Sequence, residues 1–183
     1  RKEWKEVLDC LQPFPSIVVW TVFNEGWGQF DAEEMALWTK AYDPSRLINP
    51  AAGAMFVEKG DLLDIHSYPM VTNVPEDKQR AVVVGGYGGT TVLFPGHQWQ
   101  SENIFGHSYA QDENYLTTMY AINAELLRLF IAKGLSAVVY TQLTDVEGEM
   151  NGLMTYDREM LKIDEARIRE TNEKLINGYN NKK

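Results

Sequence analysis

Short continuous apolar runs alternate along the chain with longer segments in which apolar residues recur at helical spacing. Five of these runs are rich in the β-branched and aromatic residues that favour strands: 16–23, 46–53, 61–68, 81–88 and 135–143. Runs without alternation are typical of strands that are buried on both faces, with helices packed outside. The pattern therefore predicts an α/β fold with a parallel sheet of about five strands.

The intervening segments predict helices. The clearest is 112–134, where Asp112 is placed to cap the first turn, apolar residues recur every three or four positions, and Gly134 ends the pattern. Residues 1–11 and 159–178 also show helical spacing. Because the chain opens inside a helical pattern, we expect it to be a piece of a longer protein.

Composition narrows the range of partners. The 183 residues are 44% apolar, enough for one domain with a sizeable core, and the formal net charge is −9. An acidic chain without a basic cluster argues against nucleic acid or an anionic membrane as partner. No apolar run approaches the roughly 20 residues that span a bilayer. Cys10 has no second cysteine to pair with, and its apolar neighbours predict a buried thiol.

Residues able to do chemistry directly follow the apolar runs. In parallel α/β proteins the carboxyl ends of the strands line the ligand site. A lone Asn-Glu pair is most often a helix-start signal, but repetition at several strand ends indicates a ligand site. The residues concerned are Asn24–Glu25, His66–Ser67–Tyr68, Gly86–Tyr87 and Gln142 to Asp145.

Glu25 is the strongest catalytic candidate. It follows an apolar run and precedes Gly26-Trp27-Gly28, so we expect a crowded, partly desolvated carboxyl that keeps its proton more readily. A protonated acid can donate to the leaving-group oxygen of a glycosidic bond. The preceding Asn24 is placed to bond a sugar hydroxyl.

Aromatic residues near the strand ends fit a sugar ligand, because the C–H faces of sugars stack on flat rings. The competing interpretation of each ring is core or rim packing. The rings are those of Trp27, Tyr68, Tyr87, Trp99 and Tyr140.

The three histidines are His66, His97 and His107, and they share no metal-ligand spacing. We therefore expect neither a metal nor a cofactor. His66 is interpreted as a sugar contact or as a partner of another catalytic group.

Four stretches together resemble a known family: VVWTVFNEGWGQFD, DLLDIHSYP, VVVGGYGG and YTQLTDVEGEMNGLMTYDR. They look like the second part of the catalytic barrel of glycoside hydrolase family 2, which contains β-galactosidases, β-glucuronidases and β-mannosidases. The resemblance covers nearly the whole chain. It implies a (β/α)8 TIM barrel, a carbohydrate substrate, hydrolysis with retention of configuration, and two catalytic glutamates. The acid/base falls on Glu25.

The resemblance also implies a nucleophile, and here the sequence departs from the pattern. Relatives of this kind end the seventh strand with Gly-Glu-aromatic-Gly-Gly, and Gly86 stands where that glutamate is expected. The glycine is natural and marks a sugar-binding pseudoenzyme, or it is engineered, or another acid substitutes. The acids available in loops are Glu102, Asp145, Glu147 and Glu149. A purely structural alternative is that Gly86 supplies backbone freedom.

Residues 1–183 are thus predicted to be the C-terminal portion of a β-galactosidase-like barrel, one domain that lacks the first strands. Such a half-barrel has open edges, so we expect an upstream barrel half or a homo-oligomer. The leading hypothesis is a retaining β-glycosidase with impaired activity, and the alternatives are a noncatalytic carbohydrate-binding protein or a half-barrel without a competent site. The residues expected near the sugar are Asn24, His66, Tyr87, Trp99 and Gln142.

Overall fold

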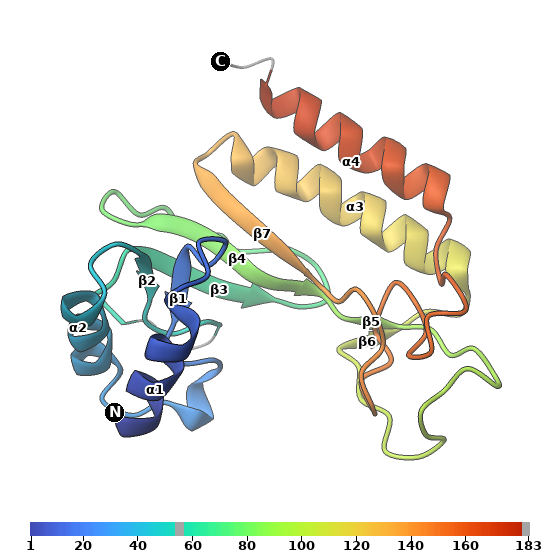
Figure 1. Ribbon diagram of the computed structural model, residues 1–183. Helices are drawn as coiled ribbons and strands as arrows, with labels where there is room; N and C mark the ends of the chain where they lie inside the picture. Colours follow the sequence, from blue (N-terminus) through green and yellow to red (C-terminus); the bar gives the residue numbers. More distant parts are fainter. Residues whose placement is uncertain (54–56, 181–183) are drawn as a thin grey trace. The chain divides into compact units, whose positions relative to one another are not determined.

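The computed structural model describes residues 1–53 and 57–180 (Figure 1). Its helices are α1 (Lys2–Leu11), the short 3-10 helix η1 (Gly26–Gly28), α2 (Ala32–Tyr42), α3 (Glu113–Ile131) and α4 (Glu165–Asn180). Its strands are β1 (Val19–Thr21), β2 (Leu47–Asn49), β3 (Leu62–Ser67), β4 (Ala81–Gly88), β5 (Thr90–Thr91), β6 (Ser108–Tyr109) and β7 (Leu135–Thr141).

Each of the five predicted runs contains a strand. β1 pairs in parallel with β2, and β5 pairs in parallel with β6, while a third sheet has the order β3-β4-β7. The two-residue strands β5 and β6 were not predicted. The α/β class with parallel strands is confirmed, but the strands of the described part do not close into a barrel.

The chain divides into two compact units, each described here by itself. Unit 1 comprises residues 1–66 and 76–83, and unit 2 comprises residues 67–75 and 84–183. The division falls inside β3 and β4.

The core of unit 1 lies between α1, α2 and the β1–β2 pair. Trp20 and Ile48 are partners in the parallel register, and both pack with Leu8 of α1 and Ala36 of α2. The indole Nε1 of Trp20 also donates to Asp43, 2.9 Å away. Hydrogen bonds, first from Ser45 and then from Trp20 and Arg46, hold the pKa of Asp43 well below its usual range despite its burial. This network fixes the turn from α2 into β2.

Helices α3 and α4 pack against each other in unit 2 (Figure 1). As predicted, Asp112 caps α3, and its side chain accepts from the backbone N–H of Tyr115. The buried face of α3 includes Leu116 and Leu127, both fully buried. The closing helix was predicted from residue 159 but begins at Glu165, because the preceding segment is held in another arrangement.

That arrangement centres on a buried ion pair. Lys162 is fully buried, and its ammonium donates to Asp145, 2.7 Å away, and to the carbonyl oxygen of Met150. Asp145 also accepts from the N–H of Gly152. Burial raises the pKa of Asp145 and lowers that of Lys162. The pair ties the segment before α4 to the loop that follows β7.

The prediction of a buried Cys10 is wrong, because the thiol is exposed. Leu8 is the buried residue of α1, so the helix turns only a narrow face to the core and Cys10 lies off it. Among the described residues, no helix combines the length and the apolar character needed to cross a bilayer.

Candidate active site

Glu25 lies in unit 1, four residues after β1, with an extended backbone at the start of η1. Its Oε1 is 2.7 Å from Nδ1 of His66, the penultimate residue of β3. The two groups share one hydrogen bond, and the tautomer of His66 decides which of them donates. The structure thus brings together two residues that the sequence singled out separately.

The carboxylate of Glu25 is partly exposed to solvent. Its side chain is 43% exposed, whereas that of His66 is 14% exposed. The side chain is thus partly buried, while its role as the catalytic acid stays a prediction. The side chain of Trp27, which was expected beside it, lies outside the described residues.

Gly53 makes the contact between Glu25 and His66 possible. A Cβ at this position would lie 2.9 Å from Nδ1 of His66 and 3.0 Å from Cγ of Glu25. The backbone of Gly53 also has a φ of +96°, which L-residues rarely adopt. Sequence reasoning missed Gly53, and its only signal was the small-residue run Ala51-Ala52-Gly53 after β2.

Asn24 is exposed, and its backbone carbonyl accepts from the side-chain amide of Gln29 at 2.7 Å. This bond fixes the backbone on either side of Glu25. Whether the Asn24 side chain contacts a sugar stays a prediction.

Gly86 lies in β4, within unit 2, and is buried. Its φ is not positive, in contrast to those of Gly88 and Gly89, at +92° and +67°. A Cβ at Gly88 would meet the ring of Tyr140 at 2.4 Å, and one at Gly89 would meet His107 at 2.5 Å. The two later glycines are therefore required by backbone and packing, whereas the backbone at position 86 suits any L-residue.

Two tyrosines of unit 2 have well-defined packing partners. Tyr87 is only 5% exposed and packs edge-on against Tyr140, and burial raises the pKa of both hydroxyls. Tyr68 stacks on His107 with parallel rings, and its hydroxyl is 2.9 Å from Thr141 Oγ1. Within unit 2, the rings of Tyr68, Tyr87 and Tyr140 therefore fit the interpretation that they serve packing.

Trp99 differs from these tyrosines because it is 60% exposed. Its ring meets Tyr156 edge-on at a centroid distance of 5.6 Å. Of the predicted sugar platforms with described side chains, Trp99 is the one with most free ring surface.

Gln142 follows β7 and bonds inside its own loop. Its side-chain amide donates to Asn151, 2.7 Å away, and lies 3.4 Å from Glu149. Among the acids that could replace a nucleophile, Asp145 is engaged with buried Lys162. Of the other three, Glu102 and Glu147 are exposed and Glu149 is half-buried.

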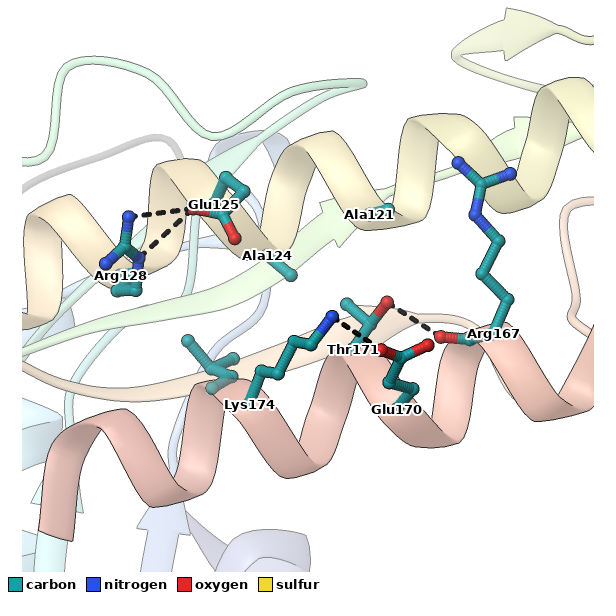
Figure 2. A pocket seen from close by; sticks show the side chains of 9 residues that line it. Ala121, Ala124, Glu125, Arg128, Arg167, Glu170, Thr171 and Lys174 are labelled. Carbon is teal, nitrogen blue, oxygen red and sulfur yellow. Dashed lines mark hydrogen bonds and ion pairs between the residues drawn. The ribbon is translucent and has the colours of Figure 1, made fainter.

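A hollow between α3 and α4 is lined by charged side chains (Figure 2). Arg128 pairs with Glu125 on α3, and Lys174 pairs with Glu170 on α4, as the dashed lines in Figure 2 show. Each of these four charges is matched within its own helix, whereas Arg167, which also lines the hollow, contacts the side chains of Asn114 and Thr118.

No sequence pattern predicted that His97 lies near two acidic side chains. His97 lies 2.8 Å from Asp157, and Glu159 is close to both. These residues are 60 and 62 positions apart, which no ligand-spacing rule covers.

The fold is thus of the α/β class with parallel strands, and it carries an acid and a histidine at strand ends, where such folds hold their catalytic groups. The family model described as "Glycosyl hydrolases family 2, TIM barrel domain" matches residues 3–169, so the chain belongs to this family. Family membership indicates a glycosidase-type function and a carbohydrate substrate. A comparison with curated proteins found no match.

Proposed function

We propose that the chain is the catalytic portion of a retaining β-glycosidase, β-galactosidase-like in its site, whose activity is impaired because the nucleophile position is Gly86. The observation that carries the proposal is the pair formed by Glu25 and His66 at the ends of two strands. Family membership supports the reaction class.

Glu25 acts as the general acid and later as the general base. In the first step it protonates the glycosidic oxygen as the bond to the anomeric carbon breaks. In the second step it takes a proton from the water that attacks the glycosyl intermediate. The hydrogen bond with Nδ1 of His66 occupies Oε1 of Glu25, which leaves Oε2 to exchange the proton with the substrate.

Retention requires a second carboxylate about 5 Å from the first, and that group attacks the anomeric carbon. Glycine has no side chain to attack with. Loss of one member of such a catalytic pair lowers turnover by about 10⁴-fold or more. Gly86 is not among the glycines of positive φ, so its backbone conformation does not bar a glutamate.

The proposal is tested by release of nitrophenol from aryl β-glycosides. The chain is compared with Gly86→Glu and with Gly86→Gln, a matched control of nearly the same size that lacks the charge. Gain of hydrolysis in Gly86→Glu alone supports the proposal, whereas equal rates in all three proteins contradict it.

A noncatalytic carbohydrate-binding protein is the second candidate. It is favoured by the same absence of a carboxylate at Gly86, together with the exposed ring of Trp99. Sugar binding by the chain, with no gain of hydrolysis in Gly86→Glu, identifies this case.

A further inference from the structure

His97, Asp157 and Glu159 meet in unit 2. Nδ1 of His97 lies 2.8 Å from Asp157 Oδ2 and 3.8 Å from Glu159 Oε2. One nitrogen and one oxygen from each acid lie within 4.8 Å of one another.

The Asp157 carboxylate is fixed in orientation. Its Oδ1 accepts from the hydroxyl of Thr155 at 2.5 Å and from the N–H of Glu159 at 3.1 Å, so Oδ2 remains directed at His97. The hydroxyl of Thr155 is the main reason that the pKa of Asp157 falls to about 2. Asp157 is therefore an anion throughout the physiological pH range.

The three atoms have the spacing of metal ligands. Zinc binds nitrogen and oxygen at about 2.0–2.1 Å, so two ligands of a tetrahedral ion lie about 3.3 Å apart. The distances of 2.8 and 3.8 Å from His97 bracket this value. The three ligand atoms all lie within 4.8 Å of one another, so binding needs a shift of the exposed Glu159 side chain and a small widening of the contact between His97 and Asp157.

The donor set selects the kind of ion. One imidazole nitrogen with two carboxylates suits zinc and other first-row divalent cations, whereas Ca²⁺ takes six to eight oxygen ligands. Imidazole binds a metal through an unprotonated ring nitrogen, so a metal at Nδ1 requires the tautomer of His97 that carries its proton on Nε2. Water can supply the fourth position.

We propose that His97, Asp157 and Glu159 form a binding site for a zinc-like divalent cation. The ion joins the long loop between β5 and β6, which carries His97, to the loop after β7, which carries both acids. This site does not depend on the function proposed for Glu25 and goes beyond it.

The test is titration of metal-free, full-length chain with Zn²⁺ by calorimetry and with Co²⁺ by visible absorption. We expect one saturable site per chain. His97→Ala and Asp157→Asn should weaken Zn²⁺ binding by more than about 100-fold, beyond the effect of losing an outer partner. Glu159→Gln should weaken it by about 10-fold, since this side chain is 71% exposed and farther from His97.

Matched controls are His107→Gln and Glu173→Gln, which remove a histidine and an exposed acid elsewhere. Both should bind Zn²⁺ as the parent chain does. Because Glu159 is exposed, Glu159→Gln keeps the fold. Circular dichroism checks the folding of His97→Ala and Asp157→Asn. Trp99 lies two residues from His97, so quenching of its fluorescence, lost in Trp99→Phe, reports binding locally.

Two results overturn the proposal. One is the absence of saturable binding by the parent chain. The other is unchanged affinity in folded His97→Ala and Glu159→Gln, which means that any binding is adventitious.

Discussion

The 2.7 Å contact between His66 Nδ1 and Glu25 Oε1 joins the end of β3 to the segment after β1. His66 is mostly buried and Glu25 is not, so the histidine is the fixed partner and the carboxyl is the group free to exchange protons. In the proposed reaction His66 is a positioning residue for the acid/base.

His66→Ala, made in the Gly86→Glu background, should lower kcat about 10–100-fold for substrates with poor leaving groups, because a misplaced acid protonates the leaving oxygen badly. Activated aryl substrates need little protonation and should change much less. The measurement is a leaving-group series in both proteins. An equal loss across the series shows that His66 has only a structural role.

Gly53→Ala should destabilise the protein by about 1–2 kcal/mol, because its φ of +96° strains an L-residue and the new methyl meets His66. It should also lower the activity of the Gly86→Glu protein. Gly178→Ala is the control, since Gly178 lies in α4 with nothing within 4 Å of a new Cβ. That control should be stabilised by about 0.5–1 kcal/mol. Urea unfolding measures the stability of both variants. Equal changes in the free energy of unfolding contradict the proposed role of Gly53.

Lys162→Met should cost about 3–5 kcal/mol of unfolding free energy, because it leaves the buried carboxylate of Asp145 without its cation. Adding Asp145→Leu should recover much of the loss, since an apolar pair of similar volume needs no compensation. The remaining cost is the unpaired N–H of Gly152, about 1–3 kcal/mol. A double variant no more stable than the single one argues against a buried ion pair.

Azide or formate should restore some turnover of an activated aryl glycoside by occupying the space of the absent carboxylate at Gly86. Glu25→Gln should then abolish the rescued turnover of substrates with poor leaving groups, while activated substrates are less affected. The rate is followed against anion concentration. Lack of rescue at any concentration in a folded sample contradicts a vacated nucleophile site.

The sequence predicted the positions of the five main strands because their apolar runs are continuous and distinct. It predicted Glu25 and His66 as separate candidates, but not their contact, since 41 residues lie between them and register decides which strand ends meet. Gly53 was missed because a positive φ leaves no periodic signal.

Other features that the sequence did not predict have the same physical origin. Apolar sequence neighbours suggested a buried Cys10, but a helix buries only the face that its contacts select. Likewise, the proximity of His97 to Asp157 is a property of two long loops, whose paths no pattern encodes. Sequence patterns predicted the helices and strands, whereas tertiary contacts determined which residues lie next to one another.

The central claim is that position 86 is where a nucleophile acts on a sugar whose leaving oxygen Glu25 protonates. The direct measurement is trapping of the Gly86→Glu protein with aryl 2-deoxy-2-fluoro-β-glycosides of galactose, glucuronic acid and mannose, followed by mass spectrometry of peptides. We expect one glycosyl group per chain, attached at residue 86 and absent from Gly86→Gln. No adduct with any of the three sugars, or an adduct at another residue, contradicts it.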